Sequence, residues 1–358
     1  MEKAYLVLAN GKIFEGQRFG ATDDVLGELV FTTSTVGYIE TLTDPTYAGQ
    51  IIMQTFPLIG NYGIIESDFE SENCFAAGYV VRDYCDKPSN FRCEKSLDEF
   101  MKQRGIVGLC GVDTRELTKI IRENGTMNAK IVTNFTGETI NEIKDAHYDN
   151  LVNMVSRKEN TFFAAQGEEK FKVAVIDCGV KNSQIENLNK YGISATLVHW
   201  DTTAEELLKM GVDGVVISNG PGNPNEYTSM IETIKGIVGK IPVFGIGLGH
   251  QLLALSQGGQ VEKLPYGHRG GNQPVRDLKD GKVYMTNQNH GYTVISESLL
   301  GKGGQARYIN INDNTCEGID YPEMKAFSVQ FHPVCDYGLR DTEENPYIRF
   351  AKLMGGAK

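Results

Sequence analysis

The amino-acid sequence predicts an α/β protein with a C-terminal, doubly wound and mostly parallel sheet, preceded by a β-rich α+β domain. From residue 171 onward, apolar strand-like runs alternate with helix-like segments, an order typical of parallel sheets. Residues 1–150 differ, because short strand-like runs there are separated by glycine-containing turns. A length of 358 residues fits about two domains. We therefore expect domains at 1–150 and 171–358, joined by a polar, weakly patterned linker at 151–170.

The N-terminal domain is expected to hold short strands and one distinct helix. Apolar runs predict strands at residues 4–8, 29–33 and 51–56. Residues 113–123 have helical spacing and begin with residue types that cap helices. They are followed by Asn124-Gly125, a common helix stop.

The C-terminal domain is expected to alternate strands and helices. Strands are predicted at 172–177, 194–199, 212–218 and 241–246, with helices at 181–191, 203–210 and 230–238. In such folds the ligand site lies at the carboxyl ends of the parallel strands. We therefore expect catalytic or ligand-binding residues in the loops that follow these strands.

Composition excludes several classes of function. The formal net charge of −11 argues against non-specific binding to nucleic acid or to anionic membranes. The N-terminus lacks a signal-peptide layout, and no apolar run is long enough to span a membrane. Seven cysteines, an odd number without paired spacing, are typical of reduced thiols and predict a cytoplasmic protein. Cys74, Cys85 and Cys93 lack the short spacing of a zinc knuckle, so no metal site is expected.

The most informative segment runs from the strand at 241–246 into a helix that starts near His250. A strand, a glycine-flanked turn and a helix form a nucleophile elbow, which exposes one side chain at the end of a parallel sheet. The exposed position is Gly247. A turn of the kind that presents a nucleophile therefore presents only a hydrogen atom.

Three further segments carry candidate chemistry. The glycines of residues 218–224 can aim backbone N–H groups at an oxyanion, although a plain strand-to-helix loop is at least as common. Residues 288–292 are expected to form a loop between strands at 282–286 and 292–295. The amides of that loop could hold an amino-acid zwitterion, with a simple β-turn as the alternative. His332 follows a strand and precedes a proline, a position suited to a general base.

Taken together, the elbow, residues 219–222, residues 288–291 and residues 330–333 resemble class I glutamine amidotransferases in order and spacing. The N-terminal half narrows the resemblance to the small subunit of carbamoyl phosphate synthetase. The motifs that carry it lie at residues 27–38, 42–47, 60–63, 111–118 and 267–275. The resemblance extends from Tyr5 to about Asp341.

The resemblance implies a glutamine pocket, a partner and a reaction. In that family the small subunit hydrolyses glutamine through a cysteine thioester, and a large subunit, which binds ATP and Mg²⁺, uses the ammonia. The resemblance implies no cofactor in this chain, a heterodimer with the large subunit, oxyanion N–H groups from Leu248 and Gly222, and His332 as base. The implied glutamine-binding residues are Ser34, Gly220, Gly222, Leu248, Gln251, Asn289, Gly291 and Tyr292.

Two of the three catalytic positions depart from the family. Gly247 stands where the family has its cysteine, and Val334 where it has the carboxylate that orients the histidine. Without a thiolate no thioester forms, and without the carboxylate the imidazole is not oriented. We therefore expect a chain that has lost glutamine hydrolysis. A natural loss is favoured over an engineered cysteine substitution, because Val334 and the residues after it are altered too.

Three functions remain open from the sequence. The first is a small subunit that supports ammonia-dependent carbamoyl phosphate synthesis by a large subunit. The second is a glutamine-binding sensor or scaffold. The third, an active glutaminase that uses a displaced thiol such as Cys335, is disfavoured, because the elbow aims at position 247. Whether the product would enter arginine or pyrimidine synthesis is left open.

Overall fold

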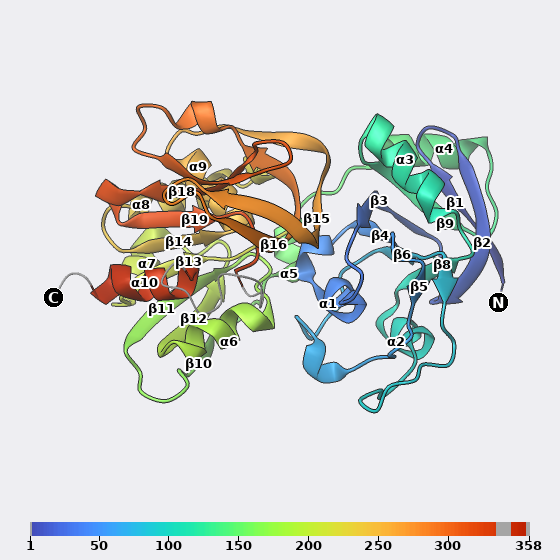
Figure 1. Cartoon of the computed structure of the whole chain (residues 1–358), viewed down its shortest axis with the longest axis horizontal. Helices are drawn as coiled ribbons and strands as arrows, with labels where there is room; N and C mark the ends of the chain where they lie inside the picture. Colours follow the sequence, from blue (N-terminus) through green and yellow to red (C-terminus); the bar gives the residue numbers. More distant parts are fainter. Residues whose placement is uncertain (1, 334–344, 356–358) are drawn as a thin grey trace. The chain divides into compact units, whose positions relative to one another are not determined.

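The computed structural model describes residues 2–333 and 345–355. The chain divides into two compact units, Met1–Leu151 and Val152–Lys358. Figure 1 colours the first unit from blue to green and the second from green to red. Each unit has a sheet and a hydrophobic core of its own.

The first unit is built around a closed barrel. Around the barrel the strands follow the order β1 (Lys3–Leu8), β2 (Ile13–Gly20), β8 (Val107–Cys110), β6 (Gly78–Val80), β4 (Gln50–Gln54), β3 (Val25–Thr32) and β9 (Met127–Val132). Its helices are α1 (Tyr38–Thr43), α2 (Leu97–Arg104), α3 (Thr114–Asn124) and α4 (Gly137–Asp145). A core that includes Phe19 of β2, Tyr79 of β6 and Phe100 of α2 joins the barrel to its helices. The β-rich α+β domain predicted from the sequence is thus confirmed.

Helix α3 shows why the sequence predicted it well. The Asp113 side chain accepts hydrogen bonds from the backbone N–H groups of Arg115 and Glu116, which caps the first turn. Leu117, Ile120 and Ile121 are buried along one face. The helix ends at Gly125, whose φ of 83° suits glycine.

The second unit contains a ten-stranded sheet within the described residues. Its centre is parallel, in the order β12 (Ile193–His199), β11 (Phe171–Asp177), β13 (Gly214–Ile217), β14 (Val243–Ile246) and β19 (Ala326–Val329). Antiparallel strands flank this centre: β10 (Thr161–Phe163) on one side, and β18 (Cys316–Tyr321), β16 (Val283–Val294), β15 (Val261–Asp277) and β17 (Gln305–Asn310) on the other. The expected mostly parallel sheet is therefore found only in the centre.

Helices cover both faces of the parallel centre, as a doubly wound sheet requires. Alternate residues of β11 enter different cores, with Ala174 and Ile176 in one and Val173 and Val175 in the other. The first core is completed by α7 (Ala204–Lys209), α8 (Thr228–Ile237) and α9 (Leu248–Ser256). The second core is completed by α6 (Asn182–Lys190) and α10 (Pro346–Gly355).

Two expectations about element boundaries were wrong. The segment 151–170 contains α5 (Leu151–Val155) and β10, and β10 pairs with β12 at the edge of the sheet, so this stretch is not a structureless linker. Residues 288–291 lie inside the continuous strand β16 and not in a loop. Glycine in that stretch suggested a turn, but β15 and β16 are paired before, between and after two register shifts, and Pro265 and Gly267 of β15 lie within the first of them.

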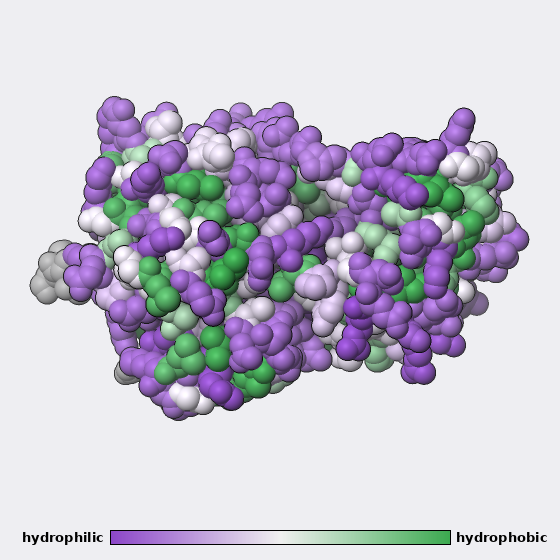
Figure 2. All heavy atoms as spheres, turned by 90° about the horizontal axis from the view of Figure 1, so that it is seen from above, coloured by the Kyte–Doolittle hydropathy of each residue, from purple (hydrophilic) through white to green (hydrophobic). Residues whose placement is uncertain are grey.

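On the face shown in Figure 2, hydrophilic side chains predominate, with smaller apolar areas among them. Scattered apolar side chains of this kind are normal on proteins. In the described part of the chain, no helix combines the length and the apolar character that crossing a membrane demands.

Candidate functional site

Gly247 occupies the turn between β14 and α9, with φ 58° and ψ −110°. Its N–H donates to the Val329 carbonyl at 2.9 Å, which fixes the turn against the neighbouring strand β19. A residue with a side chain is strained in this backbone region, whereas glycine is not. The strand–turn–helix layout predicted from the sequence is present, with glycine at its tip.

A side chain at position 247 would meet defined neighbours. An added Cβ would lie 3.0 Å from the Asn219 Cβ and 3.9 Å from the Gln330 carbonyl oxygen. The loop after β13 and the segment after β19 therefore border the place where such a side chain would stand.

Two further glycines let strand and helix approach closely. A Cβ on Gly245 would lie 2.6 Å from the Gly249 carbonyl oxygen. A Cβ on Gly249 would collide with the Ile217 carbonyl of β13. The elbow thus requires glycine at both positions, because there is no space for a methyl group.

The loop after β13 contributes backbone groups to the same edge of the sheet. Gly222 has φ 93°, and Gly220 packs so closely against Cys178 that a Cβ there would collide with the Cys178 carbonyl. Within residues 2–333 and 345–355, neither the Leu248 nor the Gly222 backbone N–H donates to a protein acceptor. Cys178 itself is fully buried, as expected of a core thiol.

Gln251 joins three segments of the candidate site. Its Nε2 donates to the Tyr292 carbonyl of β16 at 2.9 Å and to Gln330 Oε1, also at 2.9 Å. Sequence reasoning named Gln251 and Tyr292 but missed Gln330. The only sequence signal for Gln330 was its position two residues before His332.

His332 lies just beyond β19, which is the parallel neighbour of β14. Its backbone N–H donates to the Asn287 carbonyl at 2.9 Å, and the residue is buried. Because parallel strands end at the same edge of a sheet, His332 and Gly247 both follow strands at that edge. Val334 and Cys335 lie outside the described residues.

Asn289 and Gly291 lie on β16, two residues apart, with Tyr292 next to them. Ser34 belongs to the first unit and follows β3. There its carbonyl accepts from Gln54 Nε2 at 2.6 Å, and its N–H donates to Thr32 Oγ1 at 3.3 Å. The structure thus places every named pocket residue except Ser34 in the second unit.

His250 is a buried histidine on α9 to which sequence reasoning gave no role. Its Nδ1 lies 2.9 Å from Ser328 Oγ, and its side chain is inaccessible to solvent. Burial lowers the pKa of His250 to about 3, so the imidazole is neutral at physiological pH.

Comparison with known proteins gives the family. Residues 6–131 match the carbamoyl-phosphate synthase small chain, CPSase domain, and residues 174–345 match glutamine amidotransferase class-I. A carbamoyl phosphate synthase small chain from Listeria monocytogenes is 44% identical over 364 residues, covering 99% of this chain and 98% of the relative.

The chain belongs to the carbamoyl phosphate synthase small chain family. Two other members of this family illustrate its breadth. A small chain from Clostridium perfringens is 45% identical, covering 95% of this chain and 97% of its own. One from Methanosarcina mazei is 44% identical, covering 99% of both chains.

Proposed function

We propose that this chain is a small subunit of carbamoyl phosphate synthase that has lost glutamine hydrolysis and supports ammonia-dependent synthesis by a large subunit. The observation that carries the proposal is Gly247 at the tip of the elbow, with φ 58°. The family places its nucleophilic thiol at this position. A hydrogen atom there cannot attack the glutamine amide carbon.

Replacement of a residue with a side chain by glycine at position 247 costs the fold little stability. A residue with a side chain at φ 58° stores on the order of 1–3 kcal/mol of backbone strain, which glycine avoids. Gly245 and Gly249, which the close packing of the elbow requires, are retained. The loss at position 247 therefore removes chemistry and leaves the scaffold in place.

The two thiols in the described part of the second unit are unsuited to replace the nucleophile. Cys178 lies near the loop after β13, but it is fully buried, and burial raises the pKa of its thiol far above the physiological range. Cys316, on β18, is also buried, and burial raises the pKa of its thiol to about 12. Neither thiol is ionised at physiological pH.

Partner binding is proposed from the family. The relatives are named small chains, and the match covers nearly their whole length and includes the N-terminal domain. A small chain that keeps both domains keeps the surfaces with which its relatives would meet a large chain. The complex would then draw nitrogen from free ammonia.

The test is a reconstituted assay with a large subunit. We expect ammonium to support carbamoyl phosphate synthesis and glutamine to give none above background. Equal rates from the two nitrogen donors would refute the proposal. The double variant Gly247→Cys/Val334→Glu should recover glutamine use, whereas either single variant should recover little, because triad members act as a unit.

A second candidate, a glutamine-binding sensor or scaffold, is favoured by the ordered polar groups around the elbow. Gln251 is held by Tyr292 and Gln330, and Asn289 and Gly291 are retained on β16. Isothermal calorimetry distinguishes the candidates. Absence of heat at millimolar glutamine would remove the sensor and leave the first proposal intact.

A further inference from the structure

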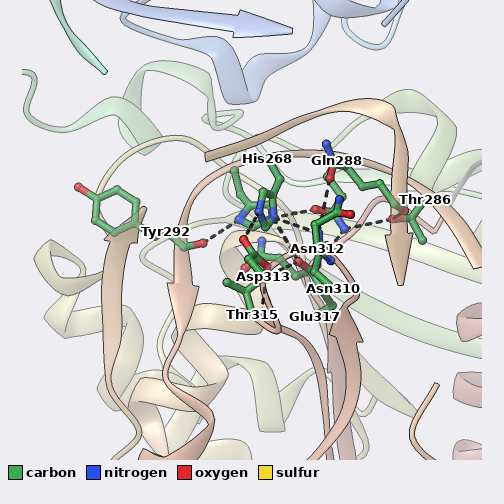
Figure 3. A network of polar contacts seen from close by, with 12 residues as sticks. His268, Thr286, Gln288, Tyr292, Asn310, Asn312, Asp313, Thr315 and Glu317 are labelled. Atoms are coloured by element: carbon green, nitrogen blue, oxygen red, sulfur yellow. Dashed lines mark hydrogen bonds and ion pairs between the residues drawn. The ribbon is translucent and has the colours of Figure 1, made fainter. Parts of the chain in front are cut away.

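A second cluster of buried polar side chains lies in the antiparallel part of the sheet, outside the elbow. His268 comes from β15, Gln288 from β16 and Glu317 from β18 (Figure 3). His290 also comes from β16. His268 and His290 are directly opposite each other in the β15–β16 ladder. Their exposed fractions are 7% and 6%, and Glu317 is fully inaccessible. A polar cluster buried to this degree needs a complete set of partners.

The outward nitrogen of each histidine has a fixed acceptor. His268 Nε2 lies 2.8 Å from Asp313 Oδ2, and His290 Nδ1 lies 2.8 Å from the Tyr292 carbonyl oxygen. A carbonyl only accepts, and an ionised carboxylate only accepts, so each ring donates its N–H outward. The inward nitrogens, His268 Nδ1 and His290 Nε2, then carry lone pairs when the rings are neutral. Histidines that bind metals are oriented by outer partners of this kind.

The inward atoms face one another and are nearly all acceptors. His290 Nε2 lies 3.1 Å from Gln288 Oε1 and 3.8 Å from Glu317 Oε1. His268 Nδ1 lies 3.3 Å from the same Glu317 oxygen, with one long contact of 3.4 Å to Asn310 Nδ2. Lone pairs in such proximity repel each other unless a proton or a metal ion stands between them.

The amide of Gln288 cannot turn over to relieve this repulsion. Its Nε2 donates to Thr286 Oγ1 and to Glu317 Oε2, each at 3.0 Å. Thr286 Oγ1 already donates its own proton to the Gln273 carbonyl at 2.9 Å. Reversing the amide would place Gln288 Oε1 against the Glu317 carboxylate, so Oε1 stays directed at His290.

A metal ion at the centre would meet both inward nitrogens at once, because His268 Nδ1 and His290 Nε2 lie 3.3 Å and 3.8 Å from the same Glu317 oxygen.

The spacing suits a small metal ion. The ligand atoms of His268, His290 and Glu317 all lie within 4.8 Å of one another. Ligands on tetrahedral zinc, with bonds of roughly 2.0–2.1 Å, are separated by about 3.4 Å. Small side-chain rotations would close the difference. Two imidazoles and a carboxylate are a ligand set that Zn²⁺ accepts, with Gln288 Oε1 or water available as the fourth ligand.

We propose that His268, His290 and Glu317 bind a divalent transition metal, Zn²⁺ or a close analogue, at a structural site that ties β15, β16 and β18 together. Cysteine spacing alone led us to expect no metal site in this chain. These ligands are dispersed over three strands and form no short motif. The site would stiffen the part of β16 that carries Asn289, Gly291 and Tyr292.

The test uses the purified full-length chain after treatment with a chelator. We expect Zn²⁺ to bind with one ion per chain in calorimetry and to raise the midpoint of thermal unfolding. Co²⁺ should give the visible d–d absorption of a tetrahedral site. Glu317→Gln and His290→Gln should abolish the cobalt spectrum. Asp313→Asn, which alters only an outer partner, should weaken binding by about 10- to 100-fold.

His147→Gln is the matched control, because it removes an exposed histidine that lies 2.9 Å from Asp149. It should leave stoichiometry, affinity and spectrum unchanged. Circular dichroism verifies that each variant is folded. The proposal fails if the parent binds no ion in a one-to-one ratio or gives an octahedral cobalt spectrum. It also fails if His147→Gln reduces binding as much as Glu317→Gln does.

Discussion

At the scale of single residues, Gly247 and His250 show that a residue's effect on stability and its chemical reactivity can be considered separately. Gly247 forms the turn between β14 and α9 with a backbone conformation that suits glycine. His250, three residues later, is held neutral by burial and contacts Ser328. One position carries no side chain, and the other carries a titratable group in a site that cannot accommodate its charge.

His250 should make stability depend on pH. Its pKa is about 3 in the fold and about 6.5 when unfolded, so the unfolded chain binds the extra proton between these values. Stability is therefore retained above pH 6.5 and lost as pH falls toward 3, by up to about 1.4 kcal/mol per pH unit. Urea unfolding at several pH values should show a shallower slope for His250→Gln. His147→Gln, at an exposed site, should retain the parental slope.

At the scale of elements, the parallel centre was predictable and the antiparallel extension was not. Strands 172–177 and 241–246 showed as short apolar runs because both of their faces are buried. β15 and β16 are half exposed. Glycine and proline interrupt β15 and glycine interrupts β16, and both residue types also mark turns. The elbow could be predicted because the glycines that form it lie within a few residues of one another in the sequence. The cluster around Glu317 could not, because it forms only when three strands pair.

Close packing between β13, β14 and α9 predicts a strong effect of one methyl group. Gly249→Ala should reduce the free energy of unfolding by about 1–3 kcal/mol, because the new Cβ would collide with the Ile217 backbone and force the helix outward. Urea denaturation measures the change. Gly137→Ala is the matched control, since no atom lies within 4 Å of a Cβ there. A loss equal to that of the control would contradict the packing argument.

At the scale of the whole molecule, two units with separate cores share one chain. The first has a barrel and the second a layered sheet. The segment 146–150 between α4 and α5 contains no regular structure, and His147, Asp149 and Asn150 in it are exposed. Composition and pattern led us to expect domains at 1–150 and 171–358 with a linker between them, and the first compact unit ends at Leu151.

Limited proteolysis should find that boundary. We expect a protease of broad specificity to cut first within residues 146–150, where backbone is exposed and irregular. Mass spectrometry would then identify two resistant fragments, one for each unit. Early cleavage within β10 or α5 would show that the boundary lies further along the chain.

The glycine at the tip of the elbow also has a consequence for the relative expression of small chains. A cell that makes this chain beside an active counterpart would have two small chains for one set of large chains. If this chain hydrolyses no glutamine, as we propose, it would compete with the active small chain for binding to the same large chains. The ratio of the two chains would then set what fraction of assemblies draws on glutamine, so relative expression would act as the control on nitrogen source.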